Sequence, residues 1–290
     1  MCTCPWCGSP VEHEYLKVQD YFLSQESFTV MSCDHCHLLF TVPRPDPSRL
    51  GSYYKSEKYF SHHENTQGFI PRVYESVKKV NLRNKILMAS EGLAVGSVLD
   101  IGCGVGDFLR GMQQAGWKVT GIEPDCDAQQ IALNRLNTLP IPPDQSGTLA
   151  NASFDLITMW HVLEHVEDLH HQIDELYRLL KPGGRLLIAV PNYKSYDAQV
   201  YREFWAAWDV PRHLNHFSSD TLRSIIKSKS FQDIDIQKLK WDSYYISYLS
   251  ETYMKHSIPL LRGFFVGLCS NLHAYHSGQF SSLVYRFQKL

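Results

Sequence analysis

The chain has 290 residues, of which 44% are hydrophobic and 20% are charged, and its formal net charge is −2. This length suits one large hydrophobic core with a small appended module. The near-neutral charge, without basic clusters, argues against a general binder of polyanions. No apolar run approaches the length of a membrane span, and the first residues lack the pattern of a signal peptide. We therefore expect a cytoplasmic protein.

The N-terminal module, residues 1–42, contains two Cys-x-x-Cys pairs. Their cysteines are Cys4, Cys7, Cys33 and Cys36. Clustered cysteines without a secretory context indicate metal binding rather than disulfides. Four thiolates on two knuckles suit a tetrahedral zinc ion, so we predict a zinc ribbon with a structural zinc, which unfolds without its metal. A redox pair or unrelated thiols are the alternatives.

Residues 43–91 are predicted to be a linker followed by N-terminal helices. Pro43, Pro45 and Pro47 make the start of this segment stiff. Aromatic residues follow, and Pro71 opens a helix that runs to about residue 90. We expect the aromatic residues to pack against the main domain, with a lid over the site as the functional alternative.

Residues 97–107 read Ser-Val-Leu-Asp-Ile-Gly-Cys-Gly-Val-Gly-Asp. The apolar run, the glycines and the helical spacing that follows predict a strand, a tight turn and a helix, as in an α/β nucleotide-binding unit. Gly102, Gly104 and Gly106 let the backbone approach a ligand, and the helix start offers free N–H groups to an anion. Taken alone, this loop is compatible with NAD, FAD, ATP or S-adenosylmethionine (SAM).

Three further strands are predicted downstream. Residues 119–122 form one that ends in Glu123, at about the distance where an acidic residue binds ribose hydroxyls. Residues 154–159 form the next, and the segment from Trp160 to His165 lies at its carboxyl end, where open α/β sheets bind ligands. A turn and a buried strand follow over residues 180–190.

Motif by motif and in order, these segments resemble the class I SAM-dependent methyltransferases, over residues 92–290. The resemblance implies an α/β fold with a Rossmann-like seven-stranded sheet, whose third strand falls in the poorly patterned segment 139–153. It also implies that the glycine loop passes the methionine end of SAM, that Asp100 reaches the amino group and that Glu123 binds both ribose hydroxyls. The predicted cofactor-binding residues are Asp100, Gly102, Cys103, Gly104, Gly106, Glu123, Trp160 and His161.

The segment His161-Val-Leu-Glu-His165 resembles most closely the ubiquinone-biosynthesis O-methyltransferases, which carry Glu-x-x-Glu-His here and can use a divalent metal. In this chain His161 replaces the first Glu. Glu164 and His165 either serve the site or make a structural hydrogen bond at the strand end.

Residues 205–218 are dense in Trp, His and Arg and lack periodicity, which is typical of loops at functional sites. They resemble a methyltransferase subgroup that combines a zinc ribbon with His-Val-Leu-Glu-His and Asp-Val-Pro-Arg-His-Leu. Related zinc-ribbon enzymes methylate carbon or oxygen of nucleotide-linked sugars. Arg212 either holds an acceptor phosphate or carboxylate or braces the loop. The predicted acid–base residues are His161, His165, His213 and His216.

Residues 241–276 form an insertion rich in Tyr, Leu and Phe before a last strand at 283–288. The insertion is compatible with an acceptor pocket, a dimer face or a patch that contacts a membrane surface, and the oligomeric state stays open.

The sequence therefore predicts a SAM-dependent methyltransferase that acts on an oxygen or carbon of a small molecule, such as a nucleotide-linked sugar. One alternative is an RNA methyltransferase, because a group of ribosomal guanine methyltransferases also joins a zinc knuckle to this core. The near-neutral charge weighs against nucleic acid as a partner. A non-catalytic SAM-binding protein is the other alternative, and the intact glycine loop argues against it.

Overall fold

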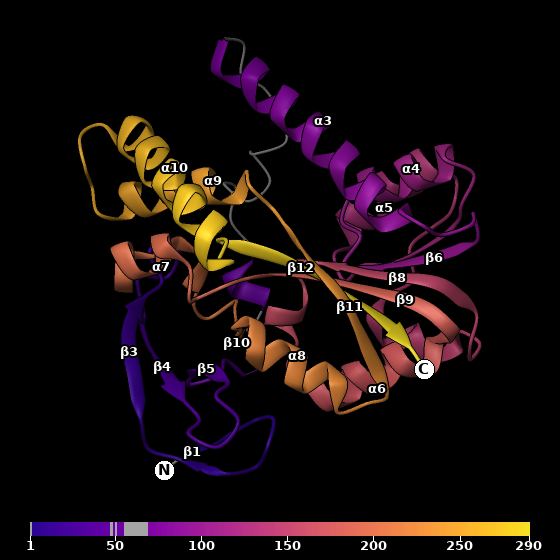
Figure 1. Cartoon of the computed structure of the whole chain (residues 1–290), viewed down its shortest axis with the longest axis horizontal. Coiled ribbons are helices and arrows are strands. Elements are labelled where there is room, and N and C mark those ends of the chain that lie inside the picture. The colour runs from indigo at the N-terminus through magenta and orange to yellow at the C-terminus, as the bar shows by residue number, and fades with distance from the viewer. Residues whose placement is uncertain (1, 47–48, 50, 55–68) are drawn as a thin grey trace.

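The computed structural model describes residues 2–46, 49, 51–54 and 69–290. Its main sheet has the strand order β11–β12–β9–β8–β6–β7 (Figure 1). The strands from β9 to β7 are parallel, whereas β12 runs antiparallel between β9 and β11. The bounds of these strands are β6 (Ser97–Ile101), β7 (Lys118–Ile122), β8 (Phe154–Trp160), β9 (Leu180–Pro191), β11 (Phe231–Lys238) and β12 (Ser282–Lys289).

The expected seventh strand is reduced to a single parallel bridge between Ile141 and Ile122. The backbone N–H of Ile141 donates to Gly121 at 2.8 Å, and its carbonyl accepts from the N–H of Glu123 at 3.1 Å. Prolines on both sides of Ile141 explain the short pairing, because proline has no N–H to donate to a ladder. The sheet thus keeps the position of a seventh strand beside β7 without its length.

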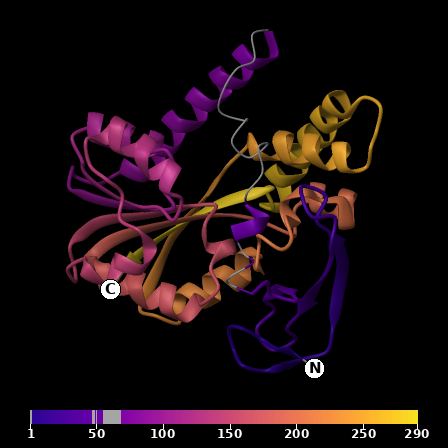
Figure 2. The same ribbon diagram turned by 180° about the vertical axis from the view of Figure 1, so that it is seen from behind.

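Helices cover both faces of the main sheet (Figures 1 and 2). Leu176 of α6 and Ile225 of α8 belong to the buried cluster on one face, and Leu109 of α4 and Ala132 of α5 belong to the cluster on the other. The helices are α3 (Phe69–Ser90), α4 (Asp107–Gln114), α5 (Cys126–Leu136), α6 (Leu169–Leu179), α7 (Tyr196–Tyr201), α8 (Ser219–Lys227), α9 (Asp242–Tyr253) and α10 (Pro259–Ser277). The α/β fold with a Rossmann-like sheet is confirmed.

The N-terminal module contains the hairpin pair β1 and β2 and a four-stranded sheet of order β10–β5–β4–β3. β10 comes from the other end of the chain and pairs antiparallel with β5, Asn215 opposite Phe40. A part of the main domain therefore completes the sheet of the small one. The strands are β1 (Cys2–Thr3), β2 (Pro10–Val11), β3 (Glu14–Gln19), β4 (Ser27–Ser32), β5 (Leu39–Val42) and β10 (Asn215–His216).

The two cysteine knuckles pack against helices of the main domain. In the first knuckle the ring of Trp6 stacks on His170 of α6 with ring centres 4.0 Å apart, and the Trp6 carbonyl accepts a 2.6 Å hydrogen bond from the same imidazole. In the second knuckle the carbonyl of His37 accepts a hydrogen bond from Thr221 of α8 at 3.2 Å. The small domain is thus held by specific contacts on both knuckles.

The insertion before the last strand forms a helical hairpin of α9 and α10, in which glycines of α10 lie directly on the backbone of α9. A Cβ on Gly263 would stand 2.7 Å from the Cα of Tyr248, and one on Gly267 would stand 2.9 Å from the Cα of Tyr244. Both glycines are buried. Their missing side chains therefore set the distance between the two helix axes.

We expect Gly263→Val to destabilise the protein by roughly 2 kcal/mol, because the added carbons meet backbone, which cannot rotate away. Cys269→Val is the matched control, since it puts the same residue at an exposed position of the same helix. Urea unfolding of both variants measures the difference. Equal unfolding midpoints would contradict close packing at Gly263.

Candidate active site

The glycine loop follows β6 at the carboxyl edge of the parallel strands. Gly102, Gly104 and Gly106 have positive φ angles of 71°, 52° and 80°, a left-handed backbone that favours glycine. A Cβ on Gly102 would stand 2.4 Å from a methyl carbon of Val162, whereas one on Gly104 would meet nothing within 4 Å. Packing therefore fixes Gly102, and the space beside Gly104 is open to a ligand.

Asp100 and Glu123 flank this loop. Asp100 is buried, accepts a 2.6 Å hydrogen bond from the hydroxyl of Thr158, and has a pKa that burial raises to about 7. Glu123 accepts hydrogen bonds from the backbone N–H groups of Gly104 (2.7 Å) and Asp125 (3.0 Å). Burial also raises the pKa of Glu123, and these two donors oppose the change only in part. Two buried carboxyl groups thus belong to the segments that surround the glycine loop, and Glu123 is bonded to the loop itself.

Cys103 has a different environment from the other predicted cofactor residues. Its backbone N–H donates to the carbonyl of Ile122 at 3.0 Å, and its side chain fills the space beside Gly121, where a Cβ would stand 2.6 Å from its sulfur. Burial raises the pKa of the thiol, so the side chain is a neutral packing group. Any contact of Cys103 with a ligand falls to its backbone.

Trp160 and Lys85 supply donors to the same region. Trp160 ends β8, and its buried Nε1 has no hydrogen-bond partner among the described residues. The ammonium group of Lys85, from α3, lies 4.8 Å from the centre of the Trp160 ring. Burial lowers the pKa of Lys85, while the charges of Asp242 and Asp100 oppose that change. An unpaired N–H and a half-buried cation are therefore available to an electronegative group of a ligand.

His161 lies between two carboxylates just after β8. Its Nε2 is 3.1 Å from Asp242 at the start of α9, and its Nδ1 is 3.4 Å from Glu164. Burial disfavours the charged imidazolium, but these carboxylates outweigh it and raise the pKa of His161 to about 9. His161 is therefore protonated at neutral pH and is not a base in that state.

Glu164 is buried to 1% exposure, and neither of its carboxylate oxygens has a hydrogen-bond partner among the described residues. It forms a group with His165 and His213 whose ligand atoms all lie within 4.8 Å of one another, a spacing that also suits a metal ion. Burial acts to raise the pKa of Glu164, but the nearby imidazoles, His161 foremost, hold it below its usual range. A charged carboxylate is thus enclosed here beside the imidazoles of His161 at 3.4 Å and His213 at 4.0 Å, without a well-aligned hydrogen bond to either.

Hydrogen bonds assign the protons of the two imidazoles beside Glu164. His165 Nδ1 is 3.0 Å from the carbonyl of Arg212, and His213 Nδ1 is 2.8 Å from the carbonyl of Ala207. Because a carbonyl only accepts, both Nδ1 atoms donate, and in the neutral rings both Nε2 atoms carry lone pairs. Burial, followed by the charge of His213, lowers the pKa of His165 to about 4.

His213 is the imidazole of this group with a carboxylate on each side. Its Nε2 lies 4.0 Å from Glu164 and 3.9 Å from Asp209. Glu164 and His213 also line a small cavity with room for about one water molecule, together with Tyr193, Asn215 and other residues of the loop.

His216 braces the loop against the N-terminal module. The hydroxyl of Thr41 donates to the carbonyl of His213 at 2.7 Å and contacts His216 Nε2 at 2.9 Å, so this Nε2 is the donor to Thr41. Burial lowers the pKa of His216 well below its usual value. The imidazole is therefore neutral and has a structural partner.

Arg212 supports the loop rather than facing open space. It is buried, and its guanidinium donates to Asp209, to Asp20 at 2.8 Å and to the carbonyl of Tyr53 at 3.1 Å. These contacts fit the alternative in which Arg212 braces the loop. They leave no edge of the guanidinium group for an acceptor phosphate.

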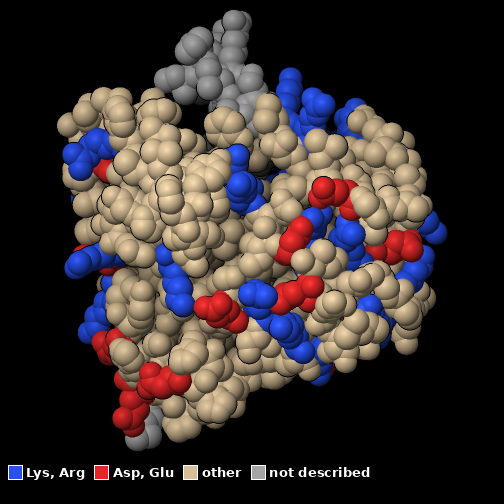
Figure 3. Space-filling view, viewed as in Figure 1, with Lys and Arg blue, Asp and Glu red and all other residues tan. Residues whose placement is uncertain are grey.

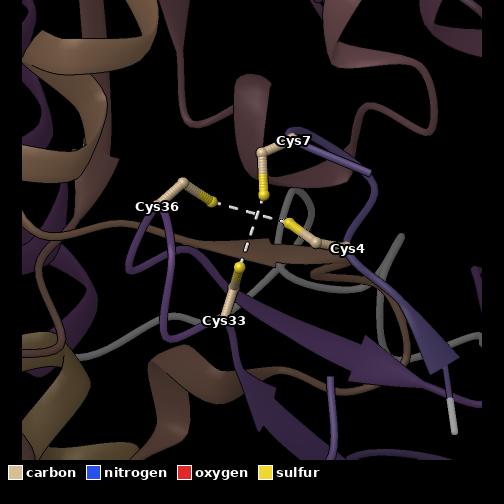
Figure 4. A group of neighbouring side chains, drawn as sticks. All are labelled: Cys4, Cys7, Cys33 and Cys36. Atoms are coloured by element: carbon tan, nitrogen blue, oxygen red, sulfur yellow. Dashed lines mark hydrogen bonds between the residues drawn. The ribbon is translucent and has the colours of Figure 1, made fainter. Parts of the chain in front are cut away.

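The four predicted cysteines form one group whose sulfur atoms all lie within 4.8 Å of one another (Figure 4). Cys4 and Cys36 are 3.5 Å apart, as are Cys7 and Cys33. Cys2 points elsewhere and contacts the carbonyl of Val11 at 3.5 Å.

The structure brings the predicted cofactor residues to one edge of the sheet and His161, His165, His213 and His216 to the adjoining loop. Sequence reasoning missed Lys85, Asp209 and Asp242. Lys85 and Asp242 are single charged residues in a helix and an insertion, and no spacing marked them. Tyr54, whose hydroxyl is 3.1 Å from His165 Nδ1, belonged to the predicted aromatic segment. Residues 55–68 of that segment, including the centre of the proposed lid, lie outside the described residues.

The nucleotide-binding α/β class is defined by a parallel sheet in which one strand leads into a glycine loop and the next strand ends in an acidic residue. A polar group lies beside both. Residues 74–235, more than half of the chain, match the family model described as "Methyltransferase domain". The chain belongs to this family.

Curated relatives share the central part of the chain. The ubiquinone biosynthesis O-methyltransferase of Pseudomonas aeruginosa is 37% identical over 137 residues, which cover 43% of this chain and 58% of that protein. The malonyl-[acyl-carrier protein] O-methyltransferase of Enterobacter lignolyticus is 32% identical over 126 residues, which cover 42% and 49%. The chain thus spans about half the length of these relatives.

Solved structures share the fold. A SAM-dependent methyltransferase from Archaeoglobus fulgidus has a TM-score of 0.50 and 21% identity, over 74% of this chain and 94% of that one. Phosphoethanolamine N-methyltransferase 2 of Haemonchus contortus has a TM-score of 0.50 and 21% identity, over 71% and 52%.

Proposed function

We propose that the protein transfers the methyl group of SAM to an oxygen or carbon nucleophile of a small molecule. The observation that carries this proposal is the buried carboxylate of Glu164, which accepts no hydrogen bond from the described residues and is enclosed with the imidazoles of His165 and His213 beside the predicted donor site. Burying a charge without hydrogen bonds is costly, so such a group is retained where a reaction or a ligand uses it. Membership of the methyltransferase family gives the reaction type.

The residues around the glycine loop fit SAM, which supplies a methyl group already activated on a sulfonium. The carboxylates of Asp100 and Glu123 suit its ammonium group and its ribose hydroxyls. Lys85 is the cation that suits the carboxylate of its methionine part, and the unpaired Nε1 of Trp160 is a second donor there. The open space at Gly104 lets the ligand lie against the backbone.

Donor binding is expected to depend on pH through Asp100. The pKa of this carboxyl in the free protein is about 7, so it must lose a proton before it pairs with the ammonium group of SAM. Affinity for SAM should then fall by about tenfold per pH unit below pH 7 and level off above it. Calorimetric titrations with SAM between pH 5.5 and 8.5 measure this dependence.

Two variants test the assignment. Asp100→Asn should bind SAM weakly with little pH dependence. Lys85→Met should bind it roughly tenfold less tightly and keep a pH dependence whose midpoint moves to higher pH, because the charge of Lys85 lowers the pKa of Asp100. Lys79→Met, an exposed lysine of the same helix, is the matched control and should bind like the unmodified protein. A pH dependence that persists in Asp100→Asn would exclude Asp100 as its origin.

On the acceptor side we assign His213 as the base. His161 already carries its proton, and His216 donates to Thr41. His213 lines the small cavity, and the carboxylates of Glu164 and Asp209, 4.0 Å and 3.9 Å from its Nε2, stabilise the imidazolium that forms when it takes the acceptor's proton. Enclosure by the loop excludes water from the transfer.

We expect His213→Ala to lower the turnover number by about 100-fold or more, with the affinity for SAM unchanged. The assay supplies labelled SAM with nucleotide-linked sugars, small phenols or RNA and identifies which fraction gains the label. His273→Ala, an exposed histidine of α10, is the control. Full activity in His213→Ala would contradict its role as the base.

The same screen separates the alternatives. Label in RNA would replace the small-molecule assignment, and SAM binding without transfer to any acceptor would favour a non-catalytic protein. Against RNA, Lys and Arg alternate with Asp and Glu over the face seen in Figure 3 and form no continuous basic surface there.

We also propose that Cys4, Cys7, Cys33 and Cys36 bind a structural zinc ion. Sulfur atoms at about 2.3 Å from a tetrahedral zinc lie about 3.8 Å apart, close to the 3.5 Å observed for two of the pairs. The ion would fix both knuckles, and through them the sheet that β10 completes.

Removing the zinc should therefore lower the melting temperature, since metal binding contributes to folding. Elemental analysis should give one zinc per chain in the purified protein, lost in Cys33→Ser and kept in the control Cys2→Ser. An unchanged melting temperature after chelation would contradict a structural role. Two zinc ions per chain would point to a second ion at Glu164, His165 and His213.

A further inference from the structure

The helical hairpin α9–α10 packs with small residues inside and large residues outside. The buried positions of α10 are Gly263, Gly267, Ser270, Asn271 and Ala274, and most of those of α9 are serines, namely Ser243, Ser247 and Ser250. In a water-soluble helix pair the large apolar residues normally fill the contact. Here Gly263 and Gly267 lie on the backbone of α9, and Ser243 donates to the carbonyl of Gly267, so the backbones approach closely. Ser250 and Ser270 instead contact Ala206 and Asp197 of the main domain.

The outer face of α10 is apolar along its length. Leu261, Phe264, Phe265, Leu272 and Tyr275 recur at helical spacing and are each between 51% and 56% exposed. Trp241, which precedes α9, and Tyr245 and Tyr248 on α9 are also exposed, and the connection adds Met254 and Ile258. An exposed apolar surface of this extent marks an interaction site rather than ordinary surface.

The exposed charges of the hairpin are positive. Lys255 and Arg262 lie at the connection and the start of α10, and Lys240 precedes α9. The acidic residues Asp242 and Glu251 point inward: Asp242 pairs with His161, and the buried carboxylate of Glu251 accepts from Arg262 and from Tyr201. In Figure 3 the region of the hairpin is mostly uncharged.

We propose that the hairpin α9–α10 docks on an anionic lipid bilayer. Helices in lipid pack with small residues between them and large apolar residues outside. Trp, Tyr and basic side chains beside the apolar residues suit the headgroup region. Among the described residues no helix meets the length and hydropathy needed to cross a bilayer, so the hairpin lies on the surface with its apolar face in the interface.

This docking surface adjoins the candidate active site. α9 begins at Asp242, whose carboxylate is 3.1 Å from His161. Docking therefore holds the site next to the bilayer. The proposal does not depend on the methyl acceptor, because it rests on the surface of the hairpin.

The experiment measures sedimentation of the full chain with phosphatidylcholine vesicles, with and without about one third phosphatidylglycerol. We expect stronger binding to the anionic vesicles and weakening by salt. The double variant Phe264→Ser, Phe265→Ser should reduce partition at least about tenfold. The control Val95→Ser, Leu139→Ser removes two equally exposed apolar side chains elsewhere and should bind like the unmodified protein.

Charge is tested separately. Lys240→Gln with Lys255→Gln should reduce the preference for anionic vesicles by about fivefold per lysine and leave binding to neutral vesicles unchanged. Hydrogen exchange tests the unmodified protein directly. Anionic vesicles should slow amide exchange in residues 258–276 and leave the exchange rates of α4 and α5 unchanged.

Two results would overturn the proposal. One is no vesicle binding, and no protection of 258–276, with either lipid composition. The other is a dimer in light scattering that Phe264→Ser, Phe265→Ser converts to a monomer without any effect of vesicles, since the hairpin would then be covered by a second copy of the chain.

Discussion

The ion pairs of the buried Arg212 hold together the proposed acceptor side of this protein. Its guanidinium joins Asp20 of the N-terminal module to Asp209 of the loop. Arg212 and Asp20 are both buried, so little water is available there to replace a lost partner. Burial alone would raise the pKa of Asp20, but Arg212 outweighs it and holds that pKa low. Removing one partner of such a pair typically costs about 3–5 kcal/mol. The carbonyl of Arg212 also orients His165, so the brace and the site share one residue.

The two halves of the site are built differently as a result. The donor side is local, because β6, its glycine loop and Glu123 lie within a short stretch whose strands are neighbours in the sheet. The acceptor side draws on distant segments: Tyr54 follows the module, His213 lies in the loop, and Asp242 opens the insertion. β10 ties these segments to the cysteine knuckles through β5. A structural metal in the module would therefore act on the site through the sheet.

This difference explains which parts of the fold and of the candidate site could be predicted from the sequence. The strands, the glycine loop and the cysteine group follow from local patterns, and the structure has each of them where the spacing predicts. The predicted cofactor residues were identified together because each lies at or just after the carboxyl end of a predicted parallel strand, β6, β7 or β8. Lys85 and Asp242 have no such marker, since only the packing of α3 and α9 brings them to Trp160 and His161. The seventh strand is reduced to the bridge at Ile141 because of the prolines on both sides of it. These prolines are a local signal against the strand that the family pattern implies.

The insertion at residues 241–276 is the clearest case of a pattern whose role could not be predicted from the sequence alone. Its Tyr, Leu and Phe residues fit a pocket, a dimer face or a membrane surface equally well until the position of the glycines is known. Gly263 and Gly267 face α9, which turns the aromatic residues of α10 outward. Because the inner contact is filled, these residues have no place in the core of the described structure. Asp242 at the start of the same hairpin pairs with His161, so an ion pair joins the element that carries the outward surface to the candidate site.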